Sequence, residues 1–304
     1  MPTVIAFSHY GPPEVLSPLQ IDTPRPGPGQ VLVRIHAAGV NPVDCKLRRG
    51  DFADAFPARF PQRLGNEFAG TIIALGPDIP PGSSVAVGTD VVGSTTAQAY
   101  AEVLLADADS LVVKPPSVPW DVAAGLPAAG QTAHTALSQL GVGRGDTVLI
   151  HAAAGGVGTF AVQLARQLGA QVIGTASERN HDYLRDLGAI PTIYGLGLSD
   201  RVRDLAPEGI DAALDLVGGQ AITASLALVP DRHRIGTTVD QHAVKEHGVQ
   251  RVGGRSLTAL REVVDLAASG RLSLPVQTFP LREVPRAHHL VEGGHVRGKV
   301  VLTA

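Results

Sequence analysis

Cysteine, aromatic residues and long apolar runs are scarce in this sequence. Of its 304 residues one is a cysteine, Cys45, and 4% are aromatic. A lone cysteine excludes an internal disulfide and any zinc site built from several thiolates. No stretch reaches the ~18 uninterrupted apolar residues of a membrane-spanning helix, and the N-terminus lacks the charged and apolar segments of a secretory signal. We therefore expect a cytoplasmic protein with no membrane contact.

An excess of charge of one sign is also missing. The 25 basic residues nearly balance the 28 acidic ones, and no basic block occurs. A nucleic-acid-binding face needs a positive field, so no nucleic-acid partner is expected. The sequence is instead 44% hydrophobic, with 35 glycines and 23 prolines. Because 304 residues exceed what one hydrophobic core usually serves, we predict two lobes with aliphatic cores and tight turns.

The pattern of the chain changes near Trp120. Before it, short strands are separated by Pro/Gly turns; Gln30 to Ala37, for example, alternates as a half-buried strand should. After it, strands and helices alternate, as in a parallel sheet covered by helices. The tail from about Leu272 returns to strand-like pieces. The predicted later elements are the strands Asp146–His151, Gln171–Thr175, Thr192–Tyr194, Asp211–Val217 and Arg234–Thr237, and the helices Val157–Leu168, Glu178–Leu187 and Ser199–Ala206.

A glycine-rich turn joins the strand that ends near His151 to the helix that follows it. This context is that of a dinucleotide fingerprint. In the register we prefer, Ala153 makes the turn, Gly155 lets the backbone approach a pyrophosphate, and Gly158 packs closely on the strand. We expect Gly155 to need glycine dihedrals. A second register, Gly156-x-Gly158-x-x-Ala161, is also a formal match. The predicted cofactor contacts here are Ala153, Gly155, Gly156, Val157 and Gly158.

The end of the second strand indicates which nicotinamide cofactor binds. NAD enzymes place a carboxylate at the ribose-reading position, where it would repel a 2′-phosphate. Here Ser177 stands at that position, with Arg179 close by. A hydroxyl and a guanidinium favour a 2′-phosphate. Glu178 is interpreted as a first-turn residue that complements the helix dipole. The cofactor is therefore predicted to be NADPH.

The sequence resembles the medium-chain dehydrogenase/reductase superfamily, and within it the zinc-independent quinone oxidoreductase (zeta-crystallin-like) family. The segments that carry this resemblance are Gly39–Asp44, Gly65–Gly70, Tyr100–Glu102, Gly130–Ala133, Ala152–Gly158, Asp215–Gly219 and Gly298–Leu302. The resemblance implies an α/β protein in which a Rossmann doubly wound parallel sheet is inserted in a GroES-like, mostly β catalytic domain. We assign residues 1–118 and 268–304 to the catalytic domain and 119–267 to the NADPH-binding domain. The family also implies a homodimer and an active site in the cleft between domains.

The resemblance implies that no metal is bound. Zinc-dependent alcohol dehydrogenases of the same superfamily carry a cysteine where this chain has Asn41 and a histidine where it has Asn66. A substrate carbonyl would then be polarised by hydrogen-bond donors. Asn41 is the first candidate, although an asparagine before Pro42 also suits a plain turn. Asp44 is expected to cap the following helix. Thr132 is the second catalytic candidate, because it resembles the family's segment near the nicotinamide, where a hydroxyl can bind the cofactor; the alternative is an ordinary threonine at a helix start.

Four further residues are predicted to contact the cofactor. Tyr194 matches a family tyrosine near the adenosine phosphate, although a strand-end tyrosine is often merely half-buried. Val217, Gly236 and Thr237 end later strands, at the sheet edge where the nicotinamide ribose should lie. The predicted reaction is NADPH-dependent reduction of a quinone or an α,β-unsaturated carbonyl compound by hydride transfer. The alternatives are a pathway-specific enoyl reductase of polyketide biosynthesis and a crystallin-like NADPH-binding protein with little turnover.

Overall fold

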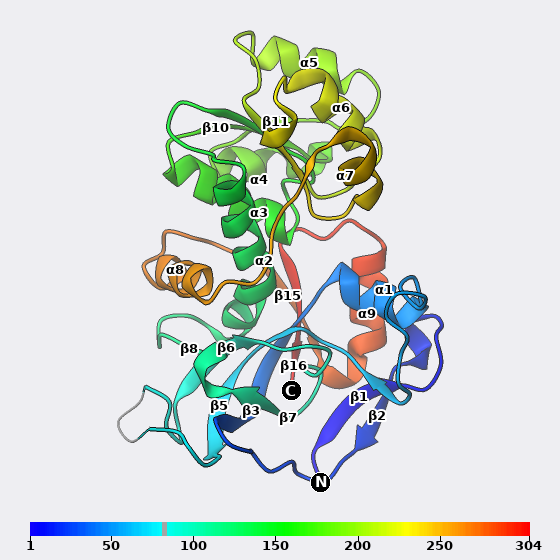
Figure 1. Ribbon diagram of the computed structural model, residues 1–304, viewed down its shortest axis with the longest axis vertical. Coiled ribbons are helices and arrows are strands. Elements are labelled where there is room, and N and C mark those ends of the chain that lie inside the picture. The colour runs from blue at the N-terminus through cyan, green and yellow to red at the C-terminus, as the bar shows by residue number, and fades with distance from the viewer. Residues whose placement is uncertain (81–83) are drawn as a thin grey trace. The chain divides into compact units, whose positions relative to one another are not determined.

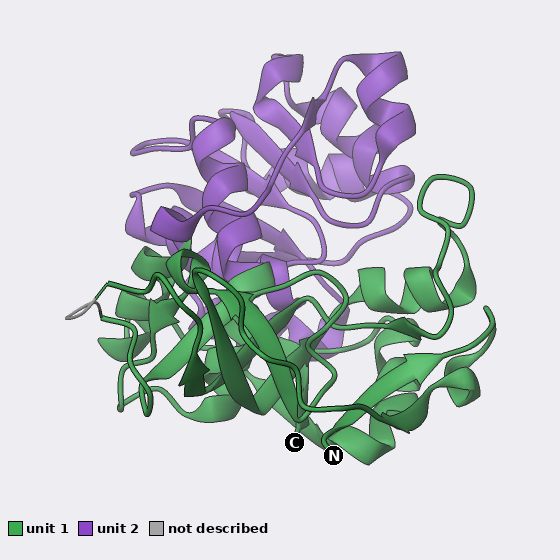
Figure 2. Ribbon diagram, turned by 60° about the horizontal axis from the view of Figure 1, so that its bottom comes forward, with its two compact units in different colours: residues 1–128, 260–304 green, residues 129–259 purple. Residues whose placement is uncertain are grey.

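Both ends of the chain build the first of two units, unit 1, which consists of residues 1–128 and 260–304; residues 129–259 form unit 2 (Figure 2). The computed structural model describes residues 1–80 and 84–304. Helix α2 (Trp120–Gln139) contributes residues to both units, as does α8 (Leu257–Ala268). No helix within the described ranges is long and apolar enough to cross a membrane.

The main sheet of unit 1 has seven strands in the described part of the chain (Figure 1). Its order is β15-β16-β3-β5-β6-β8, and β7 pairs with β3. The smaller sheet has the order β2-β1-β4. The strands of unit 1 are β1 (Thr3–Phe7), β2 (Ser17–Gln20), β3 (Gln30–Val40), β4 (Gln62–Arg63), β5 (Glu67–Leu75), β6 (Asp90–Ser94), β7 (Val103–Asp107), β8 (Val112–Val113), β15 (Val276–Pro280) and β16 (Lys299–Thr303); its helices α1 (Pro42–Arg49) and α9 (Val284–Glu292) pack on each other.

Unit 2 contains a parallel sheet in the order β11-β10-β9-β12-β13-β14. Numbered from its own first strand, this order is 3-2-1-4-5-6, that of a dinucleotide-binding doubly wound fold. The strands are β9 (Thr147–Ile150), β10 (Gln171–Thr175), β11 (Ile190–Thr192), β12 (Ala212–Asp215), β13 (Ile235–Thr237) and β14 (Gln250–Arg251); the helices are α3 (Gly156–Gln167), α4 (His181–Asp186), α5 (Leu198–Leu205), α6 (Gln220–Leu228) and α7 (Gln241–His247). The predicted fold class, a Rossmann sheet with a GroES-like, mostly β part, is confirmed.

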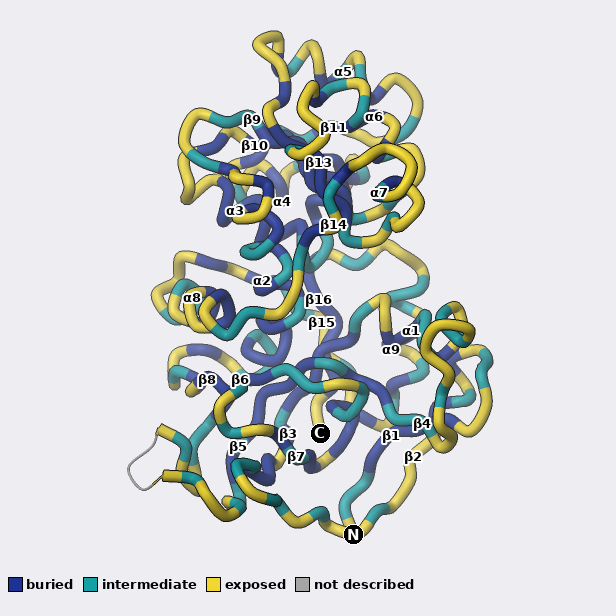
Figure 3. The backbone as a smooth tube through the Cα atoms, viewed as in Figure 1, coloured by how far each residue is buried: buried dark blue, intermediate teal, exposed yellow. Residues whose placement is uncertain are grey.

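Burial follows the sheets of each unit (Figure 3). In unit 2 the central strand β12 is buried along its whole length, as expected for a parallel strand covered on both faces. In unit 1 the core includes Phe7, Phe68 and Ile72, each 1% exposed or less. Because the strands are anchored in these cores, the residues just beyond their ends are held in fixed positions.

Helix α9 contradicts the strand-like tail expected from the sequence. Along the chain it follows β15 and precedes β16. Pro285 lies in its first turn, where a proline is tolerated because that N–H has no helical partner. Val284, Ala287 and His288 are buried, at the spacing of three and four that one helix face requires. The apolar pattern of this helix is weak in the sequence, because one residue of its buried face, His288, is a polar residue type.

Strand β11 ends earlier than predicted. The sequence indicated a strand from Thr192 to Tyr194, whereas β11 spans Ile190–Thr192 and Tyr194 lies beyond it. Pro191 lies within β11. It is tolerated because β11 is an edge strand that pairs only with β10, so the missing N–H costs no ladder bond. Tyr194 is therefore in a loop and is 55% exposed.

Candidate active site

Three strand ends meet around Asn41 in unit 1. Strand β3 ends at Val40, directly before Asn41. Strand β16 begins at Lys299, and its next residue pairs with Val40. Strand β5, which is antiparallel to β3, begins at Glu67. The sheet register therefore gathers an amide, an ammonium and a carboxylate that lie far apart in the sequence.

These three side chains form a closed hydrogen-bond network. The Lys299 ammonium donates to Glu67 Oε1 at 2.5 Å and to Asn41 Oδ1 at 2.6 Å. Asn41 Nδ2 donates to the same Glu67 oxygen at 2.8 Å, and Glu67 Oε2 accepts the Ala128 N–H at 2.6 Å. Lys299 is 4% exposed and Glu67 is fully buried. Buried charges persist only when they are paired and hydrogen-bonded, which is the case for both groups.

Gly39 makes room for this network. A Cβ atom at Gly39 would lie 2.2 Å from Glu67 Oε1. Such an overlap is not sterically possible, so the carboxylate can reach Lys299 and Asn41 only over a glycine. Gly39 begins the first segment on which the family resemblance rests. The contact with Glu67 explains why a glycine is required at this position.

The partners of Asn41 determine how its amide is oriented. An ammonium can only donate and an ionised carboxylate can only accept, so the atom facing Lys299 is Oδ1 and the atom facing Glu67 is Nδ2. Nδ2 carries a second hydrogen, for which no acceptor is present in residues 1–80 and 84–304. Asn41 is only partly buried. Unit 1 thus presents one N–H donor in a fixed direction.

The expected capping role of Asp44 is confirmed, although Asp44 is the third residue of α1 and not a residue that precedes the helix. Its Oδ2 accepts the backbone N–H of Asn41 at 2.9 Å, at the start of α1. Asp44 also accepts hydrogen bonds from Asn66 Nδ2 at 2.7 Å and from the Tyr100 hydroxyl at 3.1 Å. Burial raises the pKa of Asp44 to about 6. Tyr100 is fully buried, so both side chains hold α1 in place from inside unit 1.

In unit 2 the glycine turn begins helix α3 as predicted. Gly156, Val157 and Gly158 form the first turn, where N–H groups have no intrahelical partner and attract an anion. A Cβ atom at Gly158 would lie 2.4 Å from the Ala152 carbonyl oxygen and 2.6 Å from Ala153 Cα. This contact gives Gly158 the close-packing role that the preferred register assigned to it. These amides suit the phosphate of a dinucleotide.

Gly155 corrects one expectation. Its φ of −76° and ψ of 177° are open to any residue, so the turn does not need glycine dihedrals at this position. The left-handed conformation is adopted by Ala152, with φ of 50°. A Cβ atom at Gly155 would touch only the Ala152 carbonyl oxygen, at 3.4 Å. Neither the backbone conformation nor packing within the chain therefore requires a glycine at position 155, and the explanation left is the close approach of a ligand.

Ser177 and Arg179 follow β10 in unit 2. Ser177 precedes a short 3-10 helix (Glu178–Asn180) and its hydroxyl accepts a hydrogen bond from Asn180 Nδ2 at 3.2 Å. Arg179 and Glu178 are exposed. The hydroxyl and the guanidinium therefore both lie just past the carboxyl end of β10, the strand next to the glycine turn.

At the ends of β12 and β13, Asp215 organises the backbone. Its Oδ1 accepts the N–H groups of Val217 and Gly218, at 2.9 and 2.8 Å. Its Oδ2 accepts the Thr237 hydroxyl at 2.7 Å. Thr237 is fully buried, and its hydroxyl serves to join the two strand ends. Gly236 packs closely too, since a Cβ there would lie 2.7 Å from the Val252 side chain.

Exposed apolar side chains line the carboxyl ends of the parallel strands of unit 2. They follow β11, β12 and β13, and they are Ile193, Tyr194, Leu196, Val217 and Val239, with exposures between 39% and 94%. In doubly wound folds ligands bind at this edge of the sheet.

Thr132 lies inside helix α2 and not at a helix start, so that alternative is wrong. The helix begins at Trp120 and continues through Pro127. Thr132 is partly buried, and its methyl carbon lies 3.0 Å from the position of a Cβ at Gly253, where φ is 101°. The neighbouring Gln131 is buried, and its Oε1 accepts the Ser256 N–H at 2.8 Å.

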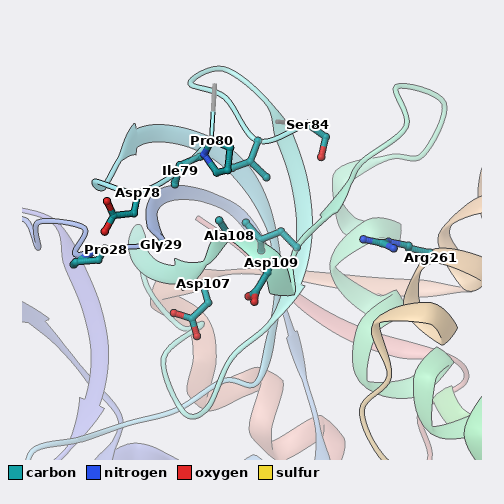
Figure 4. A pocket seen from close by; sticks show the side chains of 12 residues that line it. Pro28, Gly29, Asp78, Ile79, Pro80, Ser84, Asp107, Ala108, Asp109 and Arg261 are labelled. Carbon is teal, nitrogen blue, oxygen red and sulfur yellow. The ribbon is translucent and has the colours of Figure 1, made fainter. Parts of the chain in front are cut away.

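Unit 1 also contains a cavity of about 570 Å³ (Figure 4). Its polar side chains include Asp78, Asp107, Asp109 and Arg261. It contains neither a predicted site residue nor a member of the Asn41 network. Across the described ranges no three His, Cys, Asp or Glu side chains are grouped so that they could hold a metal ion.

Two protein-family models match the chain. Residues 27–116 match the alcohol dehydrogenase GroES-like domain, and residues 187–302 match a zinc-binding dehydrogenase domain. The quinone oxidoreductase of Coxiella burnetii is 34% identical, with a TM-score of 0.86 over 100% of this chain and 99% of that one. The Escherichia coli quinone oxidoreductase complexed with NADPH is 26% identical, with a TM-score of 0.87 over 99% and 100%.

The chain belongs to the quinone oxidoreductase family of the medium-chain dehydrogenases/reductases. Its relatives include the spectinabilin polyketide synthase system protein NorB of Streptomyces orinoci, which is 36% identical over 310 residues and 96% of this chain. The chain spans only 5% to 14% of the length of this protein, of two other polyketide synthase proteins and of an erythronolide synthase that it matches.

Glu67 and Lys299 were not predicted from the sequence as members of a site. Each is a charged residue at the first position of an apolar strand, β5 and β16, and the two charges are opposite. The only local signal of their role in the sequence is a charged residue at the start of a buried strand. It could have suggested two buried partners, but not that Asn41 lies between them.

Proposed function

We propose that this protein is an NADPH-dependent reductase of quinones or α,β-unsaturated carbonyl compounds, and that it works without a bound metal. The observation that carries the proposal is the Asn41 amide, whose second Nδ2 hydrogen faces no acceptor in the described residues. Bound NADPH would supply a hydride to the substrate. The chain would supply cofactor binding and charge stabilisation.

The residues of unit 2 would hold the cofactor as follows. The N–H groups of Gly156, Val157 and Gly158 would bind the pyrophosphate, with Gly155 allowing its close approach. Ser177 and Arg179 would bind the 2′-phosphate, since a hydroxyl and a planar guanidinium both donate to phosphate oxygens. The remaining proposed contacts, all at or near strand ends except Thr132 within α2, are Thr132, Ala153, Tyr194, Val217, Gly236 and Thr237.

Asn41 of unit 1 would act on the substrate. Reduction of a quinone or an enone places negative charge on the carbonyl oxygen. A preorganised N–H donor stabilises that charge more than it stabilises the neutral ground state, which lowers the barrier. Asn41 is restrained by Glu67 and Lys299 before any substrate binds, so little reorganisation is required. Solvent would then protonate the oxygen.

Steady-state oxidation of NADPH with a panel of quinones and enones tests this function. We expect turnover with at least one of these classes, and a loss of about 100-fold in kcat for Asn41→Ala. NADPH binding without turnover on any substrate would instead support a crystallin-like binding protein. An unchanged kcat in Asn41→Ala would contradict the proposed role of the amide.

An enoyl reductase is the second candidate, favoured by the identity with polyketide synthase proteins across nearly the whole chain. The two candidates use the same cofactor and differ in the substrate. An α,β-unsaturated thioester of N-acetylcysteamine, compared with a free enone and a quinone, separates them. A much higher kcat/KM for the thioester would identify the enoyl reductase.

A further inference from the structure

The Lys299 ammonium uses all three of its hydrogens within the protein. Besides Asn41 Oδ1 and Glu67 Oε1, it lies 3.4 Å from the Val40 carbonyl oxygen. An ammonium has three donors and no acceptor. Lys299 is 4% exposed, so it has neither a free hydrogen nor an open path toward a substrate. Its effect on a reaction must pass through Asn41 or Glu67.

We propose that Lys299 and Glu67 are positioning residues that fix and strengthen the Asn41 donor. This inference rests on the proposed function, because it assigns the machinery behind the Asn41 amide. Lys299 holds Oδ1 and Glu67 holds the first Nδ2 hydrogen. With both ends held, the amide cannot flip, and the second Nδ2 hydrogen has a single direction.

The positive charge on Lys299 also acts through the amide. A cation at Oδ1 draws electron density from the nitrogen, so the remaining N–H becomes a stronger donor to a developing oxyanion. Glu67 balances the charge, since a buried ammonium without a counter-charge would be too costly. Gly39 leaves the space for Glu67, and the Ala128 N–H holds its other oxygen. Each part of the arrangement thus contributes to one donor.

A purely structural role makes a different prediction. A buried ion pair often adds no stability over an uncharged replacement of similar shape. If the pair only packs, a variant that removes both charges can melt at a different temperature, but its folded form should keep nearly the same kcat. If the pair positions Asn41, kcat should fall in a fold that still melts and binds NADPH normally.

The test is a mutant cycle between the ion pair and Asn41 in the full chain. The variants are Lys299→Met/Glu67→Gln, which leaves no unpaired charge, Asn41→Ala, and the combination of all three substitutions. We expect the double variant to lower kcat by about tenfold or more, with KM changed less than kcat and the NADPH dissociation constant unchanged. In the Asn41→Ala background the same double substitution should change kcat less than twofold.

The outcomes separate this inference from the proposed function. If Asn41→Ala alone leaves kcat unchanged, the proposed role of Asn41 fails. If Asn41→Ala lowers kcat but the double variant does not, or lowers it equally with and without Asn41, the positioning role is overturned and the function stands.

A second measurement on the unaltered protein covers the case in which the double variant does not fold. The side-chain ¹⁵N–¹H signals of Asn41, assigned by their loss in Asn41→Ala, should lie away from those of solvent-exposed asparagines, and the two amide hydrogens should not exchange places by rotation. Shifts like those of exposed asparagines, with rapid rotation, would contradict the positioning role.

Discussion

The Asp215 carboxylate at the end of β12 accepts the Thr237 hydroxyl at the end of β13, with 2.7 Å between the two oxygens. Its other oxygen holds the N–H groups of Val217 and Gly218. One buried carboxylate therefore fixes the backbone at two neighbouring strand ends. These are the ends at which the proposed nicotinamide half of the cofactor would bind.

We expect Asp215→Asn to weaken NADPH binding and to lower the free energy of unfolding by about 1–3 kcal/mol, because an amide cannot replace every acceptor that the carboxylate offers. Asp211→Asn is the matched control, since Asp211 lies at the opposite end of β12, where it accepts the N–H of Thr147, the first residue of the neighbouring strand β9. It should cost stability without changing NADPH affinity. Equal loss of affinity in both variants would count against a role of Asp215 at the binding edge.

Arg179→Ala should weaken NADPH binding by about 1.5–3 kcal/mol, as for a lost hydrogen bond to a charged group, with little change for NADH. The exposed Arg185, bonded to Asp182, provides a control: Arg185→Ala should leave both affinities unchanged. Isothermal titration with each cofactor measures the difference. Equal weakening for NADPH and NADH in Arg179→Ala would show that this residue does not contact the 2′-phosphate.

Two glycines of one turn should respond differently to substitution. Gly155→Val should abolish NADPH binding while the chain stays folded, because the backbone there suits any residue and the side chain would fill the space near the phosphates. Gly158→Ala should lower stability by about 1–3 kcal/mol, because its Cβ would overlap the Ala152 carbonyl. Thermal melts and NADPH titration measure both effects. A Gly155→Val protein that binds NADPH normally would place the cofactor elsewhere.

Acid should destabilise the protein in part through His151. Burial lowers the pKa of His151 to about 4, below the ~6.5 of an unfolded chain. Between these values the unfolded state binds more protons, so the stability that neutral His151 allows above pH ~6.5 is lost as the pH falls toward 4. From pH 6.5 to 5.0 this contributes about 2 kcal/mol at most. Urea unfolding of His151→Gln should show a correspondingly smaller loss over that interval. The same loss as in the unaltered protein would assign the acid sensitivity to other groups.

Metal analysis of the purified protein should find no stoichiometric zinc, and chelators should leave activity unchanged. The physical reason is the Lys299 ammonium, which lies against Asn41 and Glu67 and would repel a divalent cation. One zinc per chain, with activity lost on its removal, would refute the metal-free mechanism.

Local patterns along the chain encode several parts of the molecule. The alternation of strands and helices after Trp120 predicts a parallel sheet, and the glycine turn between β9 and α3 predicts a dinucleotide site. Each signal lies within a few tens of residues, where hydrophobic period and turn chemistry act directly. The capping role of Asp44 was predictable for the same reason, since its acceptor contact is with Asn41, three residues before it.

The surroundings of Asn41, in contrast, depend on contacts between distant parts of the chain. Its partners Glu67 and Lys299 are 26 and 258 residues away in the sequence, and no local period relates them. The register of β3, β5 and β16 brings them together, and burial then requires their charges to pair. The turn at Gly155 is a second feature that the sequence pattern did not predict, because Ala152, and not Gly155, adopts the left-handed conformation. A sequence pattern states which residue types are near one another along the chain, whereas the register of the sheet decides which of them share a hydrogen bond.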